Sequence, residues 1–201
     1  MSLLRVGVDE AGRGPLAGPV VSCALWLPRR PGFRVRDSKK TPPRQRQEIF
    51  QWLRQYALFA VALSREGEID ELNILKATFL AFERAISGLL KKAPQLSTAE
   101  FVIDGPCFRT SLPVRIRCEK GADARVLEVS CASIVAKVAR DHCMELAHCV
   151  WPEWDFARHK GYPTARHREL LQRREASLFH RKSYRPCHRR QIGEYAQRAD
   201  G

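Results

Sequence analysis

Short apolar segments that suit β-strands alternate along this chain with longer segments of helical periodicity, and this order limits the folds open to it. The strand-like segments, rich in Val, Ile, Leu and Phe, are residues 3–8, 20–27, 58–63, 101–103 and 114–117. The helix-like segments, with apolar residues at three- and four-residue spacing, are residues 44–56, 71–90 and 130–150. The alternation predicts an α/β fold in which a mixed β-sheet is flanked by helices.

The 201 residues, with 44% hydrophobic and 28% charged side chains, suit one domain that buries its own core. We expect a single domain over residues 1–201, with a core at 1–155 and a basic, helical carboxy-terminal extension at 156–201. No apolar segment approaches the ~20 residues that span a bilayer, and the amino terminus does not look like a leader. We therefore expect a cytoplasmic protein without a membrane partner, and a monomer. The seven cysteines are scattered without a C-x-x-C pair, which predicts reduced thiols.

The charge of the chain favours a polyanionic partner such as a nucleic acid. Lys and Arg total 35 against 22 Asp and Glu, which gives a net charge of +13. Residues 158–198 hold twelve of the basic and three of the acidic residues, so this segment supplies +9 of the total. Taken alone, such a run also suits a solvated basic face.

Four acidic residues lie beside segments that we expect to be buried. Asp9 and Glu10 follow the first predicted strand, Asp104 follows the fourth, and Asp141 lies in the third predicted helix. Any one of them alone suits an ordinary turn or surface position. Together they make an oxygen-rich site for Mg²⁺ or Mn²⁺, because two divalent ions held about 3.5–4 Å apart need several carboxylates around them. The pattern predicts a centre for two metal ions.

Two further patterns leave alternatives open. The Gly- and Pro-rich segment 12–19 does not match a dinucleotide-binding fingerprint, and it is either a tight turn between strands or a place where main-chain N–H groups approach a sugar or phosphate. Ser133, Lys137 and Asp141 recur every four residues and share one helix face. That face either contacts a phosphate or holds only a Lys–Asp pair.

The chain resembles ribonuclease HII along nearly its whole length. The segments that carry the resemblance are GVDEAGRGPLAGPVV (7–21), DSKK (37–40), DELNILKATFLAF (70–82), VIDG (102–105), EVSCASIVAKVARD (128–141) and HKGYPTARH (159–167). The resemblance implies a ribonuclease H-like fold with a carboxy-terminal helical extension. It also implies an endonuclease that hydrolyses the RNA strand of RNA–DNA hybrids and cuts 5′ to single ribonucleotides in duplex DNA, leaving 3′-hydroxyl and 5′-phosphate ends. The cellular role would be removal of ribonucleotides from DNA.

The resemblance also implies roles for individual residues. The catalytic and metal-binding set would be Asp9, Glu10, Asp104 and Asp141, with two Mn²⁺ or Mg²⁺ ions. Main-chain groups of Gly12, Arg13 and Gly14 would read the ribose 2′-hydroxyl, which distinguishes RNA from DNA. Tyr162 would stack on the sugar at the RNA–DNA junction. Candidates for phosphate contacts are Ser38, Lys39, Ser133 and Lys137.

The sequence departs from the family pattern at Thr41, Cys131 and Tyr184, where Leu, Ala and Phe are usual. None of these residues is an acid, so only local packing is in question. Two other hypotheses fit part of the pattern. A related nuclease that cuts branched DNA would share the acids but not the G-R-G turn with its downstream tyrosine. A binding protein without catalysis would need only the basic face.

Overall fold

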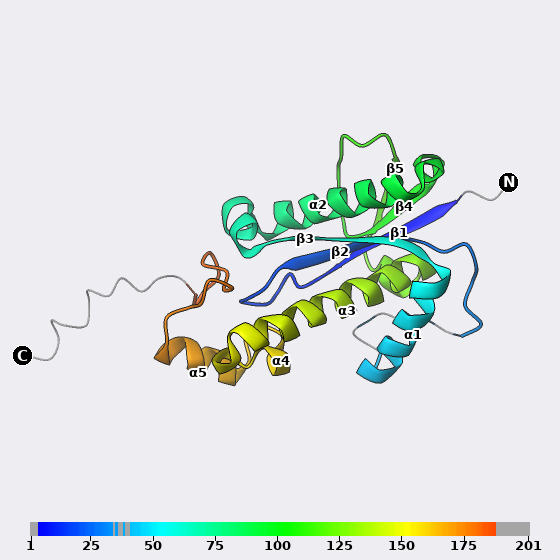
Figure 1. The fold of residues 1–201 in the computed structure, drawn as a ribbon. Coiled ribbons are helices and arrows are strands. Elements are labelled where there is room, and N and C mark those ends of the chain that lie inside the picture. Colours follow the sequence, from blue (N-terminus) through cyan, green and yellow to red (C-terminus); the bar gives the residue numbers. More distant parts are fainter. Residues whose placement is uncertain (1–3, 34, 36–37, 39–40, 188–201) are drawn as a thin grey trace, which may run out of the picture.

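The computed structural model describes residues 4–33, 35, 38 and 41–187, which form a five-stranded sheet with helices on both faces (Figure 1). The strands are β1 (Arg5–Ala11), β2 (Val20–Trp26), β3 (Leu58–Ser64), β4 (Glu100–Asp104) and β5 (Arg115–Glu119). The α-helices are α1 (Pro43–Tyr56), α2 (Glu66–Lys92), α3 (Leu127–Val150), α4 (Phe156–His159) and α5 (Ala165–Arg173). Short 3₁₀ turns are η1 (Pro94–Thr98), η2 (Ala122–Ala124) and η3 (Pro152–Trp154).

The sheet is mixed, as the alternation of segments predicts. Its strand order is β3-β2-β1-β4-β5. Strand β2 is antiparallel to β1 and to β3, whereas β1, β4 and β5 run parallel to one another. The carboxyl ends of these three parallel strands therefore meet at one edge of the sheet, which is where open α/β sheets place their ligand sites.

Helix α2 covers one face of the sheet, and α3 with α1 covers the other (Figure 1). Alternate residues of β1 face the two layers: Val6 and Val8 belong to the core beneath α2, and Gly7 faces α3. A Cβ atom on Gly7 would lie 2.1 Å from the backbone of Glu128, so α3 approaches β1 more closely than any side chain would allow. This close approach brings Asp9, one alternate position further along β1, beside the start of α3.

The carboxy-terminal extension packs on the end of α3 through a core that includes Met144, Trp154 and Phe156. Over its described residues, 156–187, the extension is helical at α4 and α5. Residues 174–187 form turns, and their main chain also pairs with the segment 16–18: Gly18 N–H donates to the Phe179 oxygen and Arg181 N–H to the Leu16 oxygen. Residues 188–201 lie outside the described part of the chain.

Element boundaries differ by up to five residues from those expected from periodicity, at β1 and α2 among others. Strand β1 continues to Ala11, so Asp9 and Glu10 lie within the strand and pair with Cys23 and Ser22 of β2. Helix α2 begins at Glu66 and bends at Asn73, which has φ 69° and ψ 164°.

Over the described residues, no helix is both long and apolar enough to cross a membrane. The seven cysteines are free thiols, and Cys23, Cys131 and Cys187 are buried.

Candidate active site

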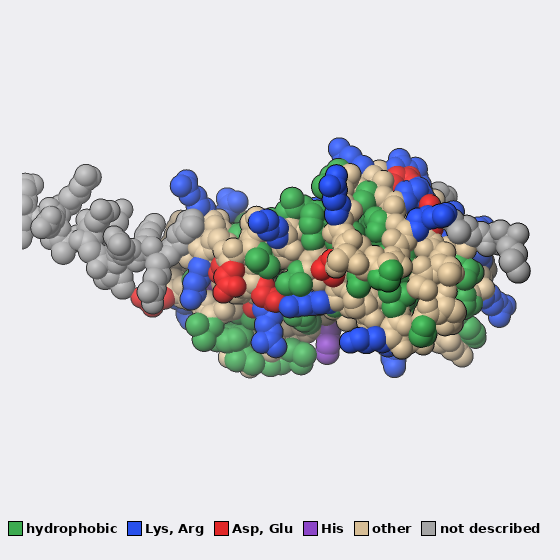
Figure 2. All heavy atoms as spheres, turned by 90° about the horizontal axis from the view of Figure 1, so that it is seen from above, with side chains coloured by type: hydrophobic (Ala, Val, Ile, Leu, Met, Phe, Trp, Pro, Cys, Tyr) green, Lys and Arg blue, Asp and Glu red, His purple; other side chains and the backbone are tan. Residues whose placement is uncertain are grey.

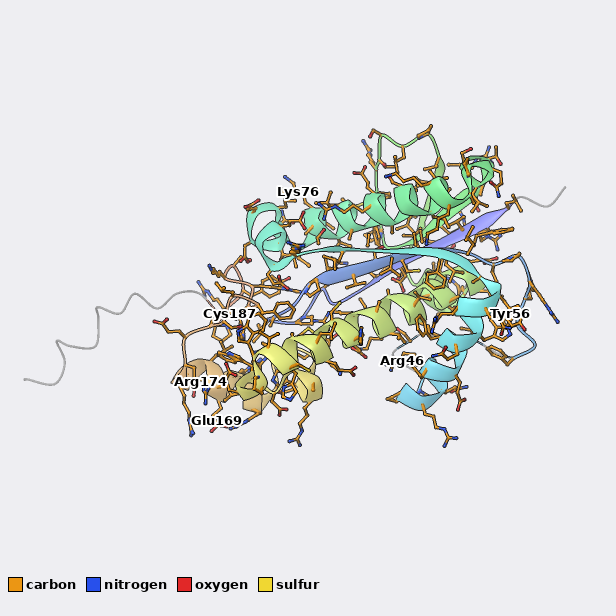
Figure 3. All side chains as sticks on the ribbon, viewed as in Figure 1. Arg46, Tyr56, Lys76, Glu169, Arg174 and Cys187 are labelled. Carbon is orange, nitrogen blue, oxygen red and sulfur yellow. The ribbon has the colours of Figure 1, made fainter. Side chains whose placement is uncertain are left out.

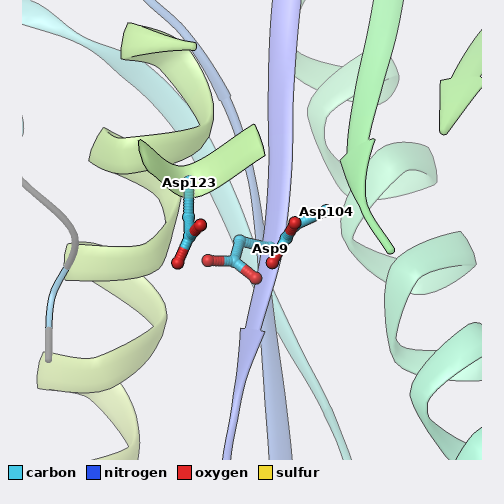
Figure 4. A group of neighbouring side chains, drawn as sticks. All are labelled: Asp9, Asp104 and Asp123. Atoms are coloured by element: carbon cyan, nitrogen blue, oxygen red, sulfur yellow. The ribbon is translucent and has the colours of Figure 1, made fainter. Parts of the chain in front are cut away.

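Three carboxylates meet at the sheet edge formed by β1, β4 and β5. Asp9 lies on β1, Asp104 ends β4, and Asp123 lies in η2, directly after β5. Each offers an oxygen within 4.8 Å of the other two, and Figure 4 shows the three side chains directed toward one another. The parallel order of the three strands thus brings Asp9 beside two acids that lie about a hundred residues later in the sequence.

Local hydrogen bonds fix the position of Asp123. The Asp104 Oδ1 atom accepts from the N–H groups of Gly121 and Ala122, at 2.7 and 2.9 Å, and so holds the start of η2. Ser130 Oγ, on α3, donates to the main-chain oxygen of Asp123 at 2.5 Å. Asp104 is therefore both a member of the acidic group and a support for the turn that carries Asp123.

The environment of Asp9 strongly disfavours its charged form. The residue is only 5% exposed, and burial, followed by the charges of Glu10 and Asp104, raises the pKa of its carboxyl well above the usual range. One hydrogen bond, from Glu10 N–H to Asp9 Oδ1 at 2.7 Å, opposes this effect. A cation offsets the repulsion within such a group, and carboxylate oxygens are the ligands that Mg²⁺ and Mn²⁺ prefer. The residues present therefore fit a divalent metal centre.

The structure separates the other two expected acids from this tight group. The Glu10 carboxylate lies 3.6 Å from the Arg13 guanidinium, although its charge still acts on Asp9. Asp141 instead forms two ion pairs, with Lys137 at 2.6 Å and with Arg46 at 3.4 Å. The Lys–Asp pair expected from the four-residue spacing is thus present on α3.

The structure groups Asp123, and not the expected Asp141, with Asp9 and Asp104. Sequence reasoning passed over Asp123 because it lies in a short 3₁₀ turn with no periodic pattern. Asp141 drew attention because it shares a helix face with Ser133 and Lys137. The signal that could have found Asp123 is its place just after a strand parallel to β4, the same relation to the sheet that singled out Asp104.

The ion pair of Asp141 supports the loop that precedes α1. Figure 3 shows Arg46 between α1 and α3, where its guanidinium also donates to the main-chain oxygens of Ser38 and Thr41. Ser38 N–H donates to Ser133 Oγ at 3.2 Å. Ser38 and Ser133 are 7% and 2% exposed, so these two expected phosphate contacts are buried supports of the loop. Lys39 lies outside the described residues.

The G-R-G turn and Tyr162 lie side by side in the structure. Gly12 has φ +100°, a conformation that favours glycine. A Cβ on Gly14 would lie 4.0 Å from the Tyr162 ring, and the ammonium of Lys137 lies 5.9 Å from the centre of the same ring. Tyr162 is 40% exposed, so the turn, the tyrosine and the lysine share one accessible surface.

Comparison with known proteins gives the family. The family model described as ribonuclease HII matches residues 6–189. The chain belongs to the ribonuclease HII family. It is therefore a ribonuclease H enzyme, a nuclease that acts on nucleic acid, and enzymes of the ribonuclease H family use divalent metal ions.

Proteins that are similar over most of the chain support the assignment to this family. A ribonuclease HII from Janthinobacterium sp. (strain Marseille) is 49% identical over 183 residues, which are 90% of this chain and 84% of the relative. Ribonuclease H2 from Pyrococcus horikoshii OT3 is 27% identical with a TM-score of 0.68, over 91% of this chain and 94% of the other. Ribonuclease HII from Archaeoglobus fulgidus, solved in complex with PCNA, is 25% identical with a TM-score of 0.66, over 85% of this chain and 88% of the other.

A basic groove adjoins the G-R-G turn of this ribonuclease HII family member. The groove, about 1280 Å³ within the described residues, runs from Gly14 and Pro163 along the carboxy-terminal extension. Its basic lining residues are Arg168, Arg173, Arg174, Lys182 and Arg185. On the face seen in Figure 2, Lys and Arg side chains are spread over the surface, with small groups of Asp and Glu between them. A groove of this charge suits a phosphate backbone.

Proposed function

We propose that this enzyme hydrolyses the RNA strand of RNA–DNA hybrids and cuts 5′ to single ribonucleotides embedded in duplex DNA. The products would carry 3′-hydroxyl and 5′-phosphate ends, and the role in the cell would be ribonucleotide removal from DNA. The enzyme would act as a cytoplasmic monomer. The observation that carries the proposal is the group of three carboxylates at the edge of the sheet, within 4.8 Å of one another.

In this proposal Asp9, Asp104 and Asp123 hold two Mg²⁺ or Mn²⁺ ions, with Glu10 beside them. When bound, the ions would activate a water molecule and stabilise negative charge on the leaving 3′ oxygen. Asp104 keeps Asp123 in place through the main chain of residues 121–122. Arg13, 3.6 Å from Glu10, connects the acids to the turn that meets the sugar.

Recognition of the ribonucleotide falls to the surface shared by the turn and Tyr162. We propose that main-chain N–H groups of Gly12, Arg13 and Gly14 meet the 2′-hydroxyl and that Tyr162 stacks on the neighbouring sugar. Lys137, close to the Tyr162 ring, and Lys39 would contact phosphates. The basic groove beyond Gly14 would hold the duplex backbone, which accounts for the concentration of positive charge in the last fifth of the chain.

The test is cleavage of an end-labelled DNA duplex that contains one ribonucleotide, in Mg²⁺ and separately in Mn²⁺. The expected product is a single cut 5′ to the ribonucleotide, with ends identified by their susceptibility to phosphatase and ligase. The Asp9→Asn and Asp123→Asn variants should lose this activity by at least about a hundredfold, because each removes a carboxylate from the metal centre.

The exposed Glu153 offers a matched control, and Glu153→Gln should cut as the wild type does. A wild-type enzyme that leaves the duplex intact in both metals but cuts long RNA–DNA hybrids would remove the single-ribonucleotide part of the proposal. Cleavage of neither substrate would remove the whole of it.

A further inference from the structure

Two buried arginines bind main-chain carbonyl groups beneath the G-R-G turn. Arg140 and Arg181 are both fully buried, and among the described residues neither lies within ion-pair distance of a carboxylate, although the charges of Glu66 and Asp70 act on Arg181. Burial lowers the pKa of both guanidinium groups, that of Arg140 to about 10. Burying an arginine without an acidic partner is unfavourable unless its N–H groups are satisfied, so the carbonyl contacts define what these side chains do.

Arg181 contacts the turn itself. Its guanidinium donates to the main-chain oxygens of Gly12 at 2.5 Å and Arg13 at 2.8 Å, and it makes two bonds to Gly18, at 2.9 and 2.7 Å. A single planar group thereby holds both ends of the loop that joins β1 to β2. The fork geometry of arginine allows this, and a lysine ammonium in the same place would not reproduce it.

Arg140 ties the same loop to the segment that carries Tyr162. Its guanidinium donates to the oxygens of Pro19 and Ala17, each at 3.2 Å, and of Lys160 at 3.0 Å. A Cβ on Gly12 would lie 2.0 Å from Arg140 Nε, so the turn rests directly on this side chain. The turn and Tyr162 are thus fixed relative to each other through buried contacts.

Tyr184 adds a contact where the family pattern usually has Phe. Its hydroxyl donates to the main-chain oxygen of Arg13 at 2.9 Å, and its ring lies 5.1 Å from the Arg181 guanidinium carbon. The ring also packs against the buried cluster that includes Val20 and Ile69. The Phe of other members could keep this packing, but it could not make the hydrogen bond.

These contacts determine where the free N–H groups of the turn point. In a trans peptide the C=O and N–H groups point in opposite directions. Arg181 and Tyr184 hold the oxygens of Gly12 and Arg13 inward, so the N–H groups of Arg13 and Gly14 point away from the protein core. Among the described residues, neither N–H donates to another main-chain oxygen.

We propose that Arg181 and Tyr184 are positioning residues that set how selectively the turn recognises a ribose 2′-hydroxyl. The inference rests on the proposed function, because it assigns the support of the sugar-reading turn. Selectivity arises because donors that are already oriented lose little freedom when the hydroxyl binds, whereas a loose turn would accept a deoxyribose almost as well.

The test separates sugar recognition from general binding. It measures kcat/KM for a duplex with one ribonucleotide, and the inhibition constant of an all-DNA duplex of the same sequence. Tyr184→Phe should lower kcat/KM about threefold to tenfold, the effect of one lost hydrogen bond, while the all-DNA inhibition constant stays within about twofold. Arg181→Lys should lower kcat/KM further, by more than about tenfold, again with little change in the inhibition constant.

The chain offers a matched control in Tyr56, which lies on α1, far from the turn (Figure 3). Tyr56→Phe should change neither quantity, and thermal unfolding should show that all three variants are folded. The inference is overturned if Tyr184→Phe leaves kcat/KM unchanged, or if both quantities weaken in proportion, as a general loss of structure would cause. A wild-type enzyme inactive on the ribonucleotide duplex would instead contradict the proposed function.

Discussion

The role proposed for Asp9 in the metal centre comes at the expense of stability. Its carboxyl is buried next to other acids, and its pKa in the folded protein lies well above the usual range because of burial first and neighbouring charges second. The fold therefore favours the protonated form. As the pH rises from the unfolded pKa toward the folded one, the unfolded state loses its proton first, and stability falls. A metal ion would reverse this penalty.

Asp9→Asn should consequently make the metal-free protein more stable above neutral pH, by about 1–2 kcal/mol, a typical gain from relieving a destabilised active site. It should also abolish cleavage. Thermal unfolding at pH 8 with and without Mn²⁺ measures the change in stability. The variant should melt at a higher temperature than the wild type in chelator, and Mn²⁺ should raise its melting temperature less. A lower melting temperature in chelator, with a full Mn²⁺ effect, would contradict this view of Asp9.

Sequence patterns singled out individual acids where a rule about chain position applied. Asp9 and Asp104 were found because acids at the ends of apolar strands point into sites at a sheet edge. Asp123 obeys the same rule but follows a short, mostly half-buried strand, β5, whose apolar pattern is weak. The positioning roles proposed for Arg181 and Tyr184 could not be predicted from sequence patterns, because they depend on contacts between residues about 170 positions apart.

At the scale of elements, helix α2 contains a strained position. Asn73 has φ 69° and ψ 164°, a region that residues other than glycine seldom adopt. Its Oδ1 accepts from the N–H groups of Leu75 and Lys76, at 3.0 and 3.2 Å, and so caps the second part of the helix. The sequence-based start at Glu71 missed the first turns because this bend interrupts the helical period.

Replacing Asn73 tests the two effects separately. Asn73→Ala loses the cap and keeps an unfavourable backbone, so it should lower the free energy of unfolding by about 1–3 kcal/mol. Asn73→Gly loses only the cap, because glycine adopts this backbone freely, and should be the less destabilising change. Urea denaturation of both variants measures the difference. An alanine variant at least as stable as the glycine variant would show that the backbone conformation is not strained.

A chain of neutral histidines stabilises the carboxy-terminal extension. His180 Nε2 lies 2.9 Å from His167 Nε2, and His167 Nδ1 lies 2.9 Å from the oxygen of Tyr162. Burial, the largest effect for both, lowers the pKa of His167 to about 4 and of His180 to about 3. Because these folded values lie below the unfolded one, their contribution to stability is full above about pH 6.5 and declines as the pH falls toward 4.

The extension should therefore loosen in mild acid. We expect the melting temperature to drop between pH 7 and pH 5, and amide hydrogens of residues 159–181 to exchange faster at pH 5 relative to those of the sheet. The exposed His142 provides the control, since His142→Gln should leave this pH dependence unchanged. A melting temperature that does not change over this pH range would refute the account.

At the scale of the whole molecule, the carboxy-terminal extension packs against the loop that joins β1 to β2. Its main chain pairs with residues 16–18, and its side chains hold the G-R-G turn, so the surface expected to read the sugar is built from both ends of the chain. Local patterns predicted the strands, the three long helices and the mixed sheet, because each depends on periodicity within a short window. They could not predict this long-range assembly, nor that residues 174–187 form turns.

Duplex binding by the whole molecule should depend steeply on salt. The logarithm of the association constant should fall linearly with the logarithm of salt concentration, with a slope of about −0.9 for each phosphate neutralised. In the basic groove, combining Arg168→Gln with Arg174→Gln, of which Arg174 is labelled in Figure 3, should make the slope less steep by nearly two. Lys91→Gln, at the exposed end of α2, should leave it unchanged. Equal slopes for all three proteins would exclude the groove from the duplex path.

The central claim is that Asp9, Asp104 and Asp123 form the metal centre, and Mn²⁺ binding measured by titration calorimetry without nucleic acid tests it most directly. Asp123→Asn should weaken Mn²⁺ binding by at least about tenfold, because it removes one of three converging carboxylates. Asp141→Asn should bind Mn²⁺ as the wild type does, because Asp141 pairs with Lys137 and Arg46. Loss of binding in Asp141→Asn with normal binding in Asp123→Asn would contradict the account.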